Sequence, residues 1–283
     1  MGWQRWLQET KKPWLSATSI EIFHKLTVSL LSLLVPLSFL LLARLSSYNY
    51  VLSITSDPNQ PPSSFLSSLL LKINPAILYA LASFVSVSTL VHGLTGKITF
   101  LSESSTAAAA AYRPRLYTAW ILLCTLQIFV GLGIEGSIAA GIDGFRFDPE
   151  RSLFSRIIFF LGLHETTLHW SRTVVKPVVD DTVFGSARKE TWVQKFAIAV
   201  SFGGLWWWRL RDEVESLVIV AEIKMEMMMG VGVVDLIGWW LYYVTVTIGM
   251  VRVVKGLMWV GVILLCRRVT RNPDDSPEDE DKV

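Results

Sequence analysis

The chain has 283 residues, of which 52% are hydrophobic and only 18% are charged, and its mean hydropathy is +0.45. A soluble globular domain usually carries about a quarter charged residues, so much of this apolar surface must face something other than water. The net charge of +2 creates no field that would attract nucleic acid, and we expect no nucleic-acid partner.

Six apolar runs approach or exceed the roughly 20 residues that a helix needs to cross a bilayer. In chain order they are Leu26 to Ala43, Pro75 to Gly96, Leu116 to Ile134, Leu153 to Trp170, Val193 to Trp208, and a region from near Val231 to just before Arg267. Because a backbone in lipid must satisfy its own hydrogen bonds, we predict an all-α, polytopic membrane helix bundle of about six transmembrane helices. We divide the chain into a cytosolic N-terminal segment (1–25), the helix bundle (26–270) and a disordered acidic tail (271–283).

The distribution of basic residues predicts the orientation of the bundle. If the N-terminus is cytosolic, the cytosolic side carries about twice as many Lys and Arg residues as the far side. The fourth run has an uninterrupted apolar stretch only from Ile157 to Leu163, but this charge bias holds only if that run crosses the membrane. We therefore expect both termini in the cytosol, with the first span as a signal anchor, in the plasma membrane or an endomembrane such as the ER rather than in an organellar membrane.

Two regions near the C-terminus allow more than one interpretation. The stretch from Leu236 to Cys266 would rise about 46 Å as a helix, against a hydrocarbon core of about 30 Å. It could tilt, continue as a cytosolic stub past Arg252 and Lys255, or divide into two membrane segments. The preceding stretch ends in a cluster of methionines, from Met225 to Met229, whose thioethers could bind Cu(I). We predict instead an amphipathic helix from Glu213 to Met229 that lies at the membrane interface, in which methionine fills space.

A polar segment, His164-Glu165-Thr166-Thr167-Leu168-His169, ends the fourth predicted span. Glu165 and His169 are four residues apart and share a helix face, whereas His164 points about 140° away from His169. His92 lies at a similar depth near the end of the second span. These residues predict a haem or metal site, with His92, His164 and His169 as cofactor ligands and Glu165 as a metal ligand. The competing interpretation is a polar cluster that holds helices together, in which Glu165 pairs with His169 or Arg172.

Three further short features predict two modification sites and one packing surface. Cys266, directly before two arginines, is a candidate for palmitoylation or a buried inert thiol. Ser276, which precedes Pro277 in the acidic tail, is a candidate phosphorylation site or part of a solvated tail. Gly133, Ser137 and Gly141 form a stripe of small residues that predicts close packing against another helix.

The segment from Phe160 to Trp170, followed by Val178-Val179-Asp180-Asp181-Thr182-Val183-Phe184-Gly185, resembles uncharacterised multi-pass membrane proteins of plants. The serine- and leucine-rich spans, the Pro-rich loop near residue 60 and the acidic tail share this resemblance. It implies a multi-pass membrane fold and carries over no activity and no functional residues.

No Walker loop, nucleophile elbow, zinc signature or dinucleotide fingerprint is present in the sequence. We therefore expect a protein without its own catalysis, a scaffold or accessory subunit that contacts the bilayer and a membrane protein partner or a second copy of itself. The alternatives are a haem- or metal-linked redox protein that uses the histidines, and a transporter or channel.

Overall fold

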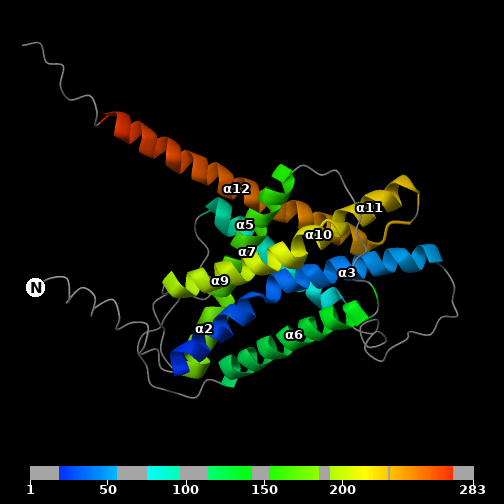
Figure 1. Ribbon diagram of the computed structural model, residues 1–283, viewed down its shortest axis with the longest axis horizontal. Helices are drawn as coiled ribbons and strands as arrows, with labels where there is room; N and C mark the ends of the chain where they lie inside the picture. Colours follow the sequence, from blue (N-terminus) through cyan, green and yellow to red (C-terminus); the bar gives the residue numbers. More distant parts are fainter. Residues whose placement is uncertain are drawn as a thin grey trace, which may run out of the picture.

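The computed structural model describes residues 19–55, 75–95, 114–139, 141, 153–184, 192–228 and 230–269. Every regular element within these residues is helical, which confirms the all-α prediction. The helices form one elongated bundle in which the blue start of the chain runs through the centre (Figure 1). The predicted N-terminal segment and acidic tail lie almost wholly outside the described residues.

The central rod of the bundle consists of α2 (Ser19–Ser32) and α3 (Leu34–Thr55). The two helices are separated only at Leu33, so Pro36 stands in the first turn of α3, where its missing N–H is tolerated. The rod begins at Ser19, earlier than the predicted start at Leu26. Its apolar side chains are enclosed, since α3 packs against α5, α6, α7 and α11.

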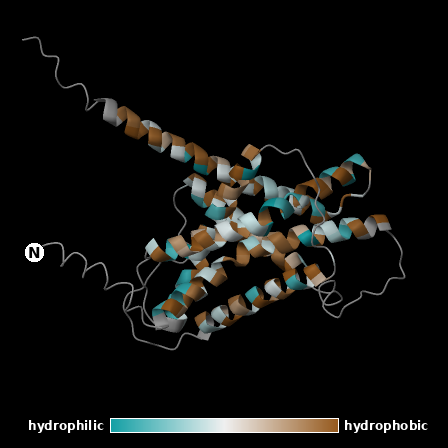
Figure 2. Ribbon diagram, viewed as in Figure 1, coloured by the Kyte–Doolittle hydropathy of each residue, from teal (hydrophilic) through white to brown (hydrophobic). Residues whose placement is uncertain are grey.

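Four helical stretches are long and apolar enough to cross a membrane: Glu21–Val51, Ala76–Thr95, Leu116–Ala139 and Val233–Leu265. They lie in the α2–α3 rod, α5 (Ala76–Thr95), α6 (Pro114–Ala139) and α12 (Val233–Val269). Brown, apolar segments recur along α6 and α12 in Figure 2, and large apolar side chains are exposed on α5, α6 and α12, with Phe84 of α5 at 69%. A surface of this kind is stable against lipid and not against water, so the protein is a multi-pass membrane protein in contact with the bilayer.

The fourth and fifth predicted spans are not among these four. The fourth corresponds to α7 (Leu153–Trp170), which is buried between α12, α5 and α3 and continues through η1 (Ser171–Val175), α8 (Lys176–Val179) and η2 (Asp180–Phe184). Pro177 removes a donor from the hydrogen-bond ladder, and π-helical turns stand on both sides of it. The fifth corresponds to α9 (Trp192–Leu205), extended by η3 (Trp206–Leu210) and α10 (Arg211–Glu213).

The predicted interfacial helix from Glu213 to Met229 is wrong. A shorter helix, α11 (Ser216–Glu226), packs on α3 and α12, and Leu217, Val218 and Val220 are fully buried. The five consecutive apolar residues from Leu217 to Ala221 surround the helix axis, so they leave no polar face for water and favour burial in the bundle.

The last region is one continuous helix, α12, and not two segments. At 1.5 Å per residue it is about 55 Å long. Its first half packs against α7, α5 and α11, whereas its second half projects from the bundle without covering (Figure 1). From Val254 to Leu265 nearly every side chain is exposed.

A very close helix crossing joins α7 to α12 through two glycines. A Cβ atom on Gly162 would lie 1.9 Å from the carbonyl oxygen of Thr245, and one on Gly249 would lie 2.0 Å from the carbonyl oxygen of Ile158. Backbone therefore rests directly on backbone, which only residues without a side chain permit. This crossing sets the position of the polar residues that follow on both helices.

Candidate functional site

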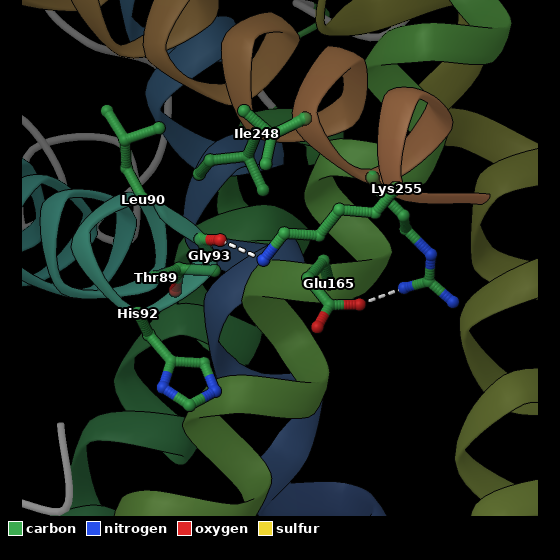
Figure 3. Close-up of a pocket in the computed structure, with 9 residues that line it drawn as sticks. Thr89, Leu90, His92, Gly93, Glu165, Ile248 and Lys255 are labelled. Carbon is green, nitrogen blue, oxygen red and sulfur yellow. Dashed lines mark hydrogen bonds and ion pairs between the residues drawn. The ribbon is translucent and has the colours of Figure 1, made fainter. Parts of the chain in front are cut away.

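A pocket of about 190 Å³ opens between the end of α5, the polar segment of α7 and the middle of α12. Its walls are formed by Thr89, Leu90, His92 and Gly93 of α5, Glu165 of α7, and Ile248, Val251, Arg252 and Lys255 of α12 (Figure 3). The α7–α12 crossing brings these elements together, because Gly162 lies one turn before Glu165 and Gly249 lies one turn before Arg252.

Two cations of α12 enter the pocket, and each has a partner on a different helix. Arg252 donates to the Glu165 carboxylate of α7, and Lys255 donates to the Gly93 carbonyl in the last turn of α5 (Figure 3). Carbonyls in the last helical turn have no partner within the helix, so an ammonium group satisfies one of them well. Glu165 thus pairs with Arg252 of α12, a partner that the sequence analysis did not identify.

Two of the predicted ligands, His92 and His169, lie together. Their ring centroids are 5.2 Å apart with the planes tilted by 39°, and the Nε2 atom of His169 is 3.1 Å from the Ser88 hydroxyl. The Nδ1 atom of His92 is buried without a hydrogen-bond partner among the described residues. Buried polar atoms are rarely left unpaired, so this nitrogen is an exception within the described part of the bundle.

His164 lies on the opposite side of α7, as the spacing predicted. Its ring packs beside Phe160 and Phe202, and its Nδ1 atom is 3.5 Å from Arg252. The three histidines and Glu165 therefore do not converge on one point. Across the described ranges, no three His, Cys, Asp or Glu side chains lie close enough together to hold a metal ion.

A buried polar group at the start of the bundle was missed by the sequence analysis, which placed His24 outside the spans. The His24 ring is 2% exposed, with Nε2 2.6 Å from the Asp180 carboxylate and Nδ1 3.0 Å from the Gln194 amide. The three residues join α2, η2 and α9. Nothing local in the sequence brings them together, since Asp180 and Gln194 are more than 150 residues from His24.

Buried and partly buried ion pairs join the helices at the end of the bundle where α3 meets α10. Arg44 of α3 donates to both carboxylate oxygens of Glu213, at 2.5 and 2.8 Å, and to the Ser137 hydroxyl of α6 at 2.7 Å. Arg156 and Glu215 form a second pair at 2.6 Å, and Lys224 and Asp235 a third at 2.7 Å. In the sequence, these charged residues stand near the ends of apolar runs, which indicates that they lie near the ends of helices. That position alone does not identify their partners.

The remaining sequence predictions have different outcomes. Gly133 and Ser137 are buried, which confirms the close-packing stripe for these two, whereas Gly141 is exposed with a φ of 75° just beyond α6. Cys266 lies in the last turns of α12, and its palmitoylation stays a prediction. Ser276 lies outside the described residues, and its phosphorylation likewise stays a prediction.

The pocket thus offers two cations, one carboxylate and an apolar wall. Comparison of the chain with protein-family models, with curated proteins and with solved structures found no match, so the role of this site follows from its own chemistry.

Proposed function

We propose that this protein crosses the membrane six times with both termini in the cytosol, and that it acts as a non-catalytic scaffold or accessory subunit. Its partner contacts the second half of α12. The observation that supports this function is the uncovered apolar rod that α12 extends beyond the bundle, from Gly256 to Leu265.

Polar and charged residues gather at two heights along the bundle, and the distance between these two levels supports six membrane crossings. His24 and Arg44 mark the two levels on the central rod, and at 1.5 Å per residue they are about 30 Å apart. Asp235 and Lys255 on α12 have the same spacing. About 30 Å is also the thickness of the hydrocarbon core, and this agreement supports our proposal that α7 and α9 cross it as well.

The end of α12 extends past the cytosolic level that Lys255 marks. Leu257, Met258 and Trp259 are consecutive, so they point in directions about 100° apart, and all three are exposed. The rod is therefore apolar on every side. A patch of this kind outside the lipid is unstable in water, and a protein partner that packs around it removes the apolar surface from water.

A photo-crosslinking residue at position 259 tests the partner. Trp259 is 67% exposed on the rod, and Phe84 is 69% exposed on the bilayer-facing side of α5, so position 84 is a matched control. We expect irradiation in native membranes to yield a protein adduct of defined mass at position 259 and lipid adducts at position 84. Lipid adducts alone at position 259 would contradict the proposal, whereas an adduct of twice the chain's mass would identify the partner as a second copy.

Cysteine labelling tests the six-span orientation. In a cysteine-free background, Met228→Cys stands at a position that is 95% exposed between α11 and α12, on the proposed far side. We expect a membrane-impermeant maleimide to label it in intact cells, because no bilayer separates it from the reagent. Ser276→Cys in the tail should react only after permeabilisation. Labelling of both in intact cells would exclude a cytosolic C-terminus.

The alternative of a haem- or metal-linked redox protein has one supporting observation, the His92 and His169 pair with its unpartnered Nδ1 atom. These two residues would supply the imidazole ligands, and other groups would have to complete the coordination. An absorption spectrum and metal analysis of the purified protein distinguish this function from the first. A Soret band or stoichiometric metal that is lost in His92→Ala would favour it.

A further inference from the structure

We propose that the pocket between α5, α7 and α12 binds the phosphate of an anionic lipid headgroup. The proposal uses the membrane depth of the six-span arrangement but does not depend on the partner of α12. Four observations support it: the charge in the pocket, the donors left in it, the apolar surface beside it, and its depth.

The side chains that line the pocket carry a net positive charge. Arg252 and Lys255 are three residues apart on α12, so they project from the same face, and Glu165 is the only carboxylate among the described lining residues. The lining side chains described thus hold one more cation than carboxylates. Of the two, Lys255 is exposed at the rim of the pocket.

Donors remain for a ligand after the internal bonds are counted. A guanidinium has five N–H groups and an ammonium three, whereas Arg252 and Lys255 each donate to only a few neighbours in the described structure. Phosphate oxygens are strong acceptors for such charged donors, and one phosphate can bind to several of them at once.

The surface beside the pocket suits an acyl chain. Leu90 forms part of the wall, and Val87 and Leu94 lie three residues before it and four after it on the same face of α5. Both are exposed, with Leu94 at 64%. On α12, Ile248 and Val251 complete the apolar side of the pocket. Free phosphate has no apolar part that could contact this surface, whereas a lipid would place its headgroup on the cations and its acyl chain along α5.

The depth of the pocket agrees with a headgroup. Lys255 marks the proposed cytosolic level of α12, and the end of α5 reaches the same level through its contact with Gly93. Anionic lipids are concentrated in the cytosolic leaflet, and basic pockets between membrane helices on that side bind their headgroups. The charge, the apolar surface and the position therefore all favour a lipid as the source of the phosphate.

Binding to the full-length protein in neutral detergent tests this site. The probes are dioctanoyl phosphatidic acid, dioctanoyl phosphatidylcholine and inorganic phosphate, measured by native mass spectrometry and by titration. We expect phosphatidic acid to bind best and Lys255→Gln to weaken it about fivefold, the contribution of one cation near a membrane surface. Lys255→Arg should retain binding, and Glu165→Gln should strengthen it, because the carboxylate no longer competes for Arg252.

Lys195→Gln is the matched control, since Lys195 is exposed at the same end of the bundle on α9 and outside the pocket. Each variant is first checked for a monodisperse elution profile. Equal binding of the phosphatidylcholine and phosphatidic acid would overturn the proposal, as would equal losses in Lys255→Gln and Lys195→Gln. Inorganic phosphate that competes as tightly as the lipid would exclude a lipid as the ligand. None of these results depends on the crosslink at position 259, so the two proposals can fail separately.

Discussion

Gly249→Ala is expected to destabilise the folded bundle by about 3 kcal/mol or more, the upper end of what overpacking costs. The new methyl group would lie 2.0 Å from the carbonyl oxygen of Ile158, and neither backbone can move without separating α7 from α12. Gly162→Ala should have a similar effect, since its methyl group would lie 1.9 Å from the Thr245 carbonyl oxygen. Unfolding by SDS in mixed micelles, followed by tryptophan fluorescence, measures the change.

Gly256→Ala provides the matched control on the same helix. A Cβ atom at Gly256 meets nothing within 4 Å, and alanine is a better helix former than glycine by about 1 kcal/mol. We therefore expect Gly256→Ala to leave the stability unchanged or to raise it slightly. Equal stability of Gly249→Ala and Gly256→Ala would show that α7 and α12 do not cross at these glycines.

Glu213→Gln is expected to lower the stability by about 3–5 kcal/mol, the usual effect of removing one member of a buried ion pair. Arg44 is 3% exposed, and Glu213 accepts hydrogen bonds from both its Nε and Nη2 atoms. Without the carboxylate, Arg44 stays buried and loses two charge-assisted hydrogen bonds that join α3 to α10. The same SDS titration measures this loss.

Glu226→Gln is the control for Glu213→Gln, because Glu226 is exposed at the end of α11 on the same side of the bundle. It should change the stability by less than about 0.5 kcal/mol, as surface substitutions usually do. The double variant Arg44→Met/Glu213→Met removes both charges and should recover much of the stability, since two apolar side chains need no partner. A Glu213→Gln protein as stable as Glu226→Gln would contradict the buried pair.

Much of the candidate site was accessible from periodicity alone. The prediction that His164 and His169 point in different directions follows from 100° per residue, and it is confirmed, as His164 packs against Phe202 while His169 faces His92. The similar depth of His92 and His169 was also predictable, because helix rise converts residue number into height. Spacing could not show that Arg252 is the partner of Glu165, since that depends on how α12 is rotated about its axis.

The crossing of α7 and α12 at Gly162 and Gly249 has a sequence signal, pairs of small residues at helical spacing, that did not enter the prediction. Thr245 and Gly249 are four residues apart, as are Gly162 and Thr166, and such pairs of small residues favour close helix packing. The sequence analysis predicted close packing for another stripe of small residues, which includes Gly133 and Ser137. That stripe lies on α6, which packs against α3. Many helices carry pairs of small residues, so a single sequence does not reveal which pairs meet.

The sequence by itself determined that this protein is built from helices and that several of them are apolar enough to lie in lipid, because hydropathy and the need to satisfy backbone hydrogen bonds are local properties. Only the tertiary structure decided that α11 is buried, that His24 pairs with Asp180, and that α12 is one helix whose second half lies bare. These outcomes depend on contacts between residues far apart in the chain. Such contacts arise from the rotation and crossing of packed helices, which the order of residues along one helix does not specify.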